Sequence, residues 1–210
     1  MTFKTKLINK DKSYTFSDYF SLNDEFENII GFFNYSHLIE NNIFKDIRDF
    51  EDVQDLKEYI LDIRKRIPLN SETAKREFLI APLLVKLIQN FKTLKLLTEK
   101  TIIFNNLLKG KLDYLLSTTE NFLIIEAKND NMENGYKQLA VEMIALDKIF
   151  EEDNINTNFI YGVISTGIQW KFVILNREKK EFLSDLEIYL LPRDLEKILG
   201  IFVEILKLEK

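Results

Sequence analysis

Two apolar runs that end in charged residues decide the fold of this chain: residues 110–116, GKLDYLL, and residues 122–128, FLIIEAK. Their residue types favour β-strands, and the short break between them favours a hairpin. Because side chains alternate along a strand, we expect Glu126 and Lys128 to point to the same face. In a hairpin, Asp113 would lie beside them. Two carboxylates and an ammonium on one surface are costly unless a metal, a proton or a substrate phosphate balances them.

The composition limits the possible classes of protein. The chain has 210 residues, of which 46% are hydrophobic, enough for one domain with an appendage or for two small domains. It has no run of about 18 apolar residues and no apolar signal core, so we expect a cytoplasmic protein without a membrane span. It has no cysteine and a single histidine, His37. This composition argues against disulfides, zinc sites, and Cys- or Ser-His-Asp-type catalysis.

Charge is distributed unevenly along the chain. The net charge is −5, yet residues 57–112 carry 12 Lys and Arg against 5 Asp and Glu, a local excess of +7 that leaves −12 elsewhere. A basic segment ahead of the acidic hairpin would suit a phosphate backbone that approaches a metal site. The alternative interpretation is that these cations lie on solvated helix faces.

The periodicity predicts an α/β protein with two regions. Residues 1–68 are expected to form a mainly helical extension, with a helix over 50–66 that Pro68 ends. Residues 69–210 are expected to begin with a helix capped by Asn70 or Ser71 and kinked or broken at Pro82. The remaining predictions are strands at 101–104, 110–116, 122–128, 158–165 and 169–176, a possible strand within 181–189, and helices at 135–150 and 192–208. This order predicts a three-layer sandwich with a mixed central sheet flanked by helices.

The charged strand ends suit metal-dependent cleavage of phosphodiester bonds. Mg²⁺ prefers oxygen ligands in octahedral geometry, and Mn²⁺ is the alternative ion. Asp113 and Glu126 supply two carboxylates, and the backbone carbonyl of Ala127 could supply a third ligand. Lys128 could orient the attacking water or stabilise the charge of the transition state. Gln138, on the following helix, could position the lysine or the DNA backbone.

These residues resemble the PD-(D/E)XK nuclease superfamily, which includes restriction endonucleases. Asp113, the Glu126-Ala127-Lys128 triplet and Gln138 carry the resemblance, although Leu112 stands where proline often precedes the aspartate. Residues 71–84, SETAKREFLIAPLL, are similar to the first motif of the nuclease domain of type I restriction R subunits and their stand-alone relatives.

In that motif a Glu precedes an Arg by four residues. Glu72 and Arg76 fit this spacing, and Glu77 is the rival position for the glutamate. Residues 162–172 also resemble a late strand-turn-strand of those domains. The resemblance spans residues 70–176 and leaves out the N-terminal third.

The resemblance implies a restriction-endonuclease-like core over residues 69–210. It also implies a Mg²⁺-dependent endonuclease that hydrolyses DNA in restriction, defence or repair. The implied catalytic residues are Glu72, Asp113, Glu126, Lys128 and Gln138. A homodimer and restriction-system partner subunits are further implications.

Two rival hypotheses stay open. The first is a catalytically inactive nuclease-fold module that binds nucleic acid or protein. The second is a structural α/β protein in which Asp113, Glu126 and Lys128 are scattered in space. If these residues have structural roles alone, Glu72 supports a helix N-terminus, Gln138 is solvated, and Trp170 is a core residue.

Overall fold

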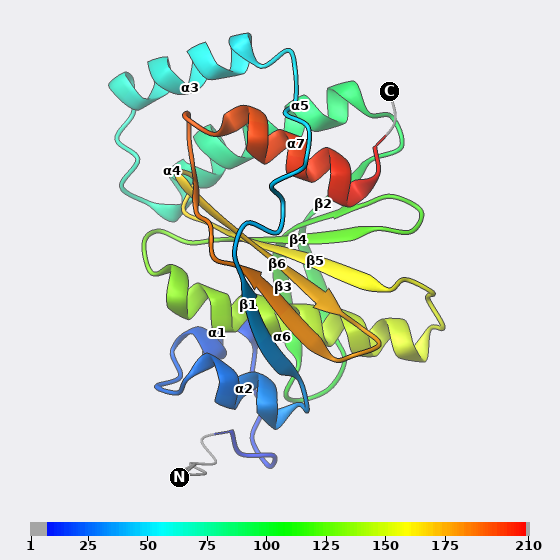
Figure 1. Ribbon diagram of the computed structural model, residues 1–210. Coiled ribbons are helices and arrows are strands. Elements are labelled where there is room, and N and C mark those ends of the chain that lie inside the picture. The colour runs from blue at the N-terminus through cyan, green and yellow to red at the C-terminus, as the bar shows by residue number, and fades with distance from the viewer. Residues whose placement is uncertain (1–7, 209–210) are drawn as a thin grey trace.

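The protein is a mixed α/β structure built on one open sheet, which the computed structural model describes over residues 8–208 (Figure 1). Seven strands follow the order β1-β7-β6-β5-β4-β3-β2, and an eighth, β8, pairs with β6. The strands are β1 (Ser36–Glu40), β2 (Lys95–Ile103), β3 (Lys109–Ser117), β4 (Phe122–Ala127), β5 (Phe159–Ser165), β6 (Gln169–Asn176), β7 (Glu181–Asp185) and β8 (Tyr189–Leu190).

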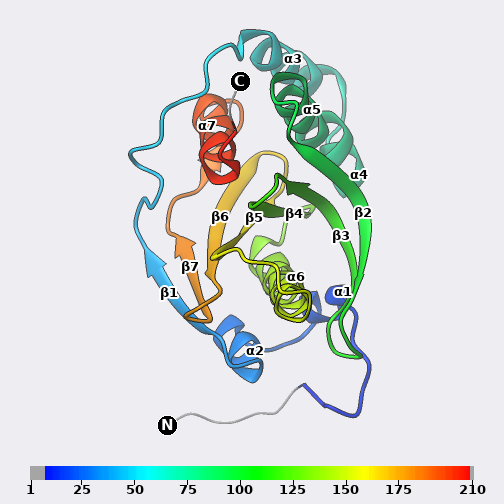
Figure 2. The same ribbon diagram turned by 90° about the vertical axis from the view of Figure 1, so that its right-hand side faces the viewer.

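Helices cover both faces of the sheet, as Figure 2 shows edge-on. They are α1 (Phe16–Phe20), α2 (Phe26–Phe32), α3 (Gln54–Arg66), α4 (Glu72–Lys75), the π-helix η1 (Arg76–Ile80), α5 (Ala81–Asn90), α6 (Met132–Glu152) and α7 (Leu195–Leu206). One apolar core joins α3, α5 and α7 to the sheet, and a second joins α1, α2 and α6 to the opposite face. The predicted mixed sheet flanked by helices is therefore confirmed.

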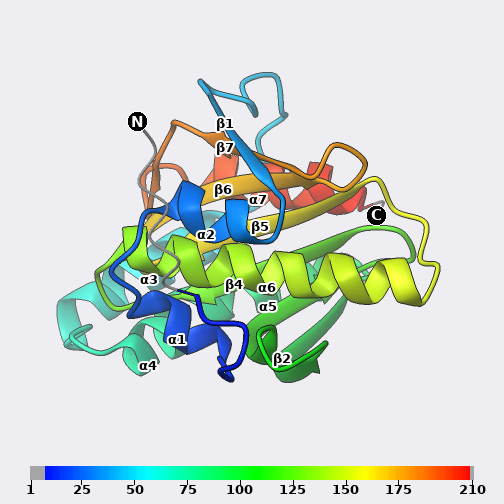
Figure 3. The same ribbon diagram turned by 90° about the horizontal axis from the view of Figure 1, so that it is seen from below.

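Helix α6 sets the direction of the central strands. It connects β4 to β5, which pair in parallel, whereas β3 pairs antiparallel with both β2 and β4. The buried stripe of α6 includes Leu139, Met143 and Ile144, as its sequence spacing predicts. Figure 3 shows α6 running across the sheet with α1 and α2 beside it. This crossover places the first turns of α6 next to the end of β4.

The break predicted at Pro82 takes the form of a π-helix. Pro82 stands in the first turn of α5 and has no amide hydrogen to donate. Immediately before it, the N–H of Ala81 bonds to the carbonyl of Arg76, five residues back. The helix therefore continues through the proline with one widened turn. At the other end of the chain, α7 begins at Leu195 rather than Pro192. Residues 191–194 form a turn before it, and the Asp194 carboxylate accepts the Leu190 N–H at 2.7 Å.

The N-terminal segment contributes to the sheet as well as to the helices. The sequence pattern does not predict β1, which pairs in parallel with β7 from Ser36↔Glu181 to Glu40↔Asp185. Just before β1, the Tyr35 hydroxyl donates at 2.5 Å to Asp147, a buried carboxylate of α6 that also pairs with Arg177 at 2.7 Å. The division at residue 68 stays a prediction. Among residues 8–208 no helix combines the length and apolar character needed to cross a membrane.

Gly162 is a close contact between the sheet and α6 and gives a stability test. A Cβ there would lie 2.5 Å from Met143 Sδ and 2.9 Å from Val173 Cγ1. Gly162→Ala should therefore destabilise the protein by about 1–3 kcal/mol through overpacking, measured by urea unfolding.

Gly31→Ala in α2 is the matched control, since no described atom lies within 4 Å of its Cβ position. This change should leave stability unchanged or raise it by about 0.5–1 kcal/mol, because alanine favours helix. An unfolding midpoint for Gly162→Ala equal to that of the parent would contradict the packing at this position.

Candidate active site

The structure brings Asp113 next to the charged end of β4. The β3–β4 ladder pairs Tyr114 with Ile125, so the next residues along the two strands are Asp113 and Glu126. Here a side chain replaces the ladder: the Ala127 N–H donates to Asp113 Oδ2 at 2.9 Å. The Asp113 carboxylate is thereby fixed to the backbone of the residue that separates Glu126 from Lys128.

Glu126 and Lys128 point to the same face, as their spacing predicts. Lys128 Nζ lies 2.5 Å from Glu126 Oε1, and the two side chains are only 13% and 2% exposed. Gly135, in the first turn of α6, leaves room for the lysine, because a Cβ there would lie 2.7 Å from Lys128 Cγ. The ammonium also lies 5.3 Å from the centre of the Phe20 ring in α1. The lysine is thus enclosed between two helices and the strand end.

Glu142 is a buried carboxylate of the site that the sequence analysis missed. The amide of Gln138 donates to Glu142 Oε1 at 2.9 Å, one helical turn further along α6. Gln138 therefore hydrogen-bonds Glu142. From the sequence we expected it to position Lys128 or the DNA backbone instead. The available signal is an acid inside the run Val141-Glu142-Met143-Ile144, where the helix period predicts burial.

The carboxyl groups shift each other's ionisation. Burial raises the pKa of Glu126 to about 8, and the charge of Asp113 adds to this rise while Lys128 opposes it. Burial and then the charge of Glu126 raise the pKa of Glu142 well above its ordinary value. Burial acts to lower the pKa of Lys128, but the charge and hydrogen bond of Glu126, together with the charges of Glu72 and Asp113, raise that pKa overall. Such a group of carboxyls favours a bound proton or cation, because close like charges resist ionising together.

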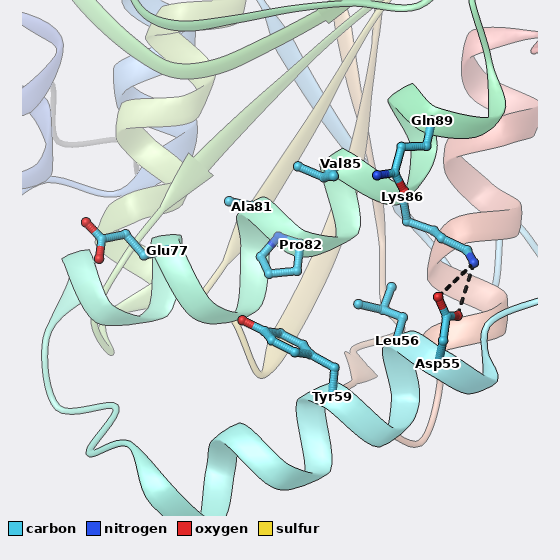
Figure 4. A pocket seen from close by; sticks show the side chains of 9 residues that line it. All are labelled: Asp55, Leu56, Tyr59, Glu77, Ala81, Pro82, Val85, Lys86 and Gln89. Atoms are coloured by element: carbon cyan, nitrogen blue, oxygen red, sulfur yellow. Dashed lines mark hydrogen bonds and ion pairs between the residues drawn. The ribbon is translucent and has the colours of Figure 1, made fainter.

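The structure distinguishes Glu72 from its rival Glu77. Glu72 opens α4 after Ser71, whose side chain caps the helix by accepting the Ala74 N–H at 3.1 Å. Its charge lies close enough to contribute to the raised pKa of Lys128. Glu77 instead lines a groove of about 460 Å³ between α3 and α5. Figure 4 shows Glu77 at one end of this groove, with Tyr59 and Pro82 further along it. Glu72 is thus the glutamate of this motif that the structure associates with Lys128.

Arg76 is a second cation at the site. Its Nη1 lies 3.1 Å from Asp113 Oδ1, and its Nη2 donates to Glu99 Oε1 of β2 at 2.7 Å. The guanidinium carbon also lies 5.2 Å from the centre of the Tyr114 ring. In the sequence, Arg76 is predicted only as part of a motif, and nothing in the local pattern indicates its contact with Asp113.

The residues that could hold a divalent cation are Asp113 and Glu126, with the backbone carbonyl of Ala127. Glu126 Oε2 is buried and has no hydrogen-bond partner within the described chain, and the same holds for Glu142 Oε2. Both oxygens of Asp113 are engaged, one by Ala127 and one by Arg76. Over residues 8–208, no group of three or more His, Cys, Asp or Glu side chains is placed to hold a metal ion. The site therefore does not form a cage of three acidic ligands.

Comparison with known proteins adds no family assignment. The chain matches no protein-family model, and no curated protein is significantly similar to it. The resemblance to PD-(D/E)XK nucleases therefore depends on the quoted residues.

A double-mutant cycle tests the buried pair on α6. Gln138→Leu removes the donor to Glu142 and should cost about 1–3 kcal/mol, because a buried acceptor loses its partner. In a Glu142→Leu background the same change should cost much less, giving a coupling of at least about 1 kcal/mol. Urea unfolding of the four proteins measures this coupling, and additive effects would contradict the hydrogen bond.

Proposed function

We propose that this protein is a Mg²⁺-dependent nuclease with a PD-(D/E)XK-type core that hydrolyses phosphodiester bonds in DNA. The observation that carries the proposal is the bond from the Ala127 N–H to Asp113, which joins one acid to the strand end bearing Glu126 and Lys128. The parallel β4–β5 pair with its α6 crossover supports it, because the strand end and the helix that covers it both supply site residues. A homodimer and restriction-system partner subunits stay predictions from the resemblance.

Three groups would hold the cation: the carboxylates of Asp113 and Glu126 and the backbone carbonyl of Ala127. Bound there, Mg²⁺ or Mn²⁺ would lower the pKa of a coordinated water and neutralise negative charge on the phosphate. The buried Glu126 Oε2 has no donor among the described residues, and either a bound cation or a proton shared with Glu142 would satisfy it.

The other residues act around these oxygens. Lys128 keeps its charge because its pKa is raised, so its ammonium can hold the attacking water or a phosphate oxygen by charge-assisted hydrogen bonds. Glu72 adds negative charge near that ammonium and helps to keep it protonated. Gln138 acts through Glu142, which lies against Glu126 in the core, and is a positioning residue.

One observation favours the alternative of an inactive binding module. Arg76 pairs with Asp113 at 3.1 Å and Lys128 pairs with Glu126 at 2.5 Å. Protein cations thus already accompany both acids that would bind the metal. An inactive module predicts that Mg²⁺ and Mn²⁺ do not bind at Asp113.

Cleavage of supercoiled plasmid and of single-stranded DNA, in Mg²⁺, Mn²⁺ or EDTA, tests the proposal. Asp113→Asn keeps an acceptor for the Ala127 N–H but removes the charge, and Lys128→Met removes the ammonium. Each change should lower the cleavage rate by at least about 100-fold, the usual effect of losing one electrostatic group in an active site.

Matched changes far from the site serve as controls. Asp153→Asn, just past the C-terminal end of α6, and Lys92→Met, just after α5, alter exposed side chains and should leave cleavage unchanged. Thermal unfolding must show that the site variants remain folded. Metal-independent cleavage, or parent-like rates for both site variants, would reject the proposed nuclease site.

A further inference from the structure

The guanidinium of Arg76 lies between two carboxylates of different strands. It contacts Asp113 Oδ1 at 3.1 Å on β3 and Glu99 Oε1 at 2.7 Å on β2. The Arg76 side chain is 23% exposed and that of Glu99 is 48% exposed, so the bridge opens toward solvent on the Glu99 side. Of the two acids that contact this guanidinium, the inner one, Asp113, belongs to the proposed metal site. The outer one, Glu99, does not.

The backbone of β2 is distorted at the outer acid. Glu99 has φ +52°, the left-handed region that residues with a side chain rarely adopt in a strand. The β2–β3 register pairs Thr98 with Tyr114 and Lys100 with Leu112 but passes over the residues between them, Glu99 and Asp113. Strained residues of this kind persist where the surrounding structure requires them, and they cluster at functional sites. The left-handed residue and the skipped pair thus mark a local break in the β2–β3 ladder at Glu99 and Asp113, where Arg76 makes its two contacts.

We propose that Arg76 acts as an internal competitor of the divalent cation at Asp113, and that Glu99 receives the guanidinium when the cation binds. This inference rests on the proposed function. An arginine keeps its charge at any ordinary pH, so it cannot yield to a metal by losing a proton. The guanidinium must instead move away from Asp113 while it keeps the contact that it already makes with Glu99. Arg76 is therefore a positioning residue that sets the apparent affinity of the site for metal.

Calorimetric titration of the full chain with MnCl₂ tests this inference without depending on cleavage. Arg76→Gln removes the competing charge and should tighten Mn²⁺ binding by at least about tenfold, because one close like charge is lost. Arg76→Lys keeps a cation and should bind close to the parent. Glu99→Gln removes the receiving partner and should weaken binding several-fold. Arg66→Gln, which alters an arginine paired with Asp62 on the exposed face of α3, is the control and should match the parent.

The outcomes separate this inference from the proposed function. If the parent binds Mn²⁺ through Asp113, as judged by loss of binding in Asp113→Asn, but folded Arg76→Gln binds no tighter, the competitor role is wrong and the nuclease proposal stands. Should Arg76→Gln not fold, parent-like affinity of Glu99→Gln would overturn the role. Tight binding by Arg76→Gln with weak binding by the parent supports it. If neither protein binds Mn²⁺, the metal site and the competitor both fail.

Discussion

The site depends on a carboxylate that is almost fully buried at the end of a central strand. Glu126 is 1% exposed, and a charge so far from water is unfavourable unless neighbouring groups compensate it. Lys128 supplies one partner, and α6 closes over both residues at Gly135. The same helix brings Glu142 against Glu126. The crossover therefore connects the two parallel strands and also places two buried carboxyl groups side by side.

Two protein cations balance this charge from different elements. Lys128 follows the strand end directly, so the strand geometry places its side chain on the same face as Glu126. Arg76 comes from the π-helix before Pro82 and reaches Asp113 from the α5 side of the sheet. The first partner thus lies two residues away in the chain, whereas the second depends on packing between layers. This difference explains why Arg76 is the one whose contact we infer to change.

Local patterns predicted much of the fold and part of the site. Strands β3 and β4 and helix α6 could be predicted from the apolar runs at 110–116 and 122–128 and from the helical period of residues 135–150. In each element, the spacing of apolar residues in the sequence marks the face that is buried. β1 escaped prediction because it is short and mostly exposed, and its partner lies far along the chain. Glu142 escaped because an acid in a helix ordinarily faces water. The contacts of Arg76 with Asp113 and Glu99 join three elements, and one-dimensional spacing does not encode such contacts.

The pairing of β1 with β7 imposes an order of assembly. Ser36 leaves the ribosome long before Glu181, so β1 must wait for nearly the whole chain before it can form its ladder. Contacts between such distant segments slow folding, since a long loop must close first. Until β1 docks, β7 is the outermost strand of the sheet, with an open row of backbone donors and acceptors that invites pairing with other chains. Docking of β1 covers the edge of β7 and makes β1 the outermost strand of the finished sheet.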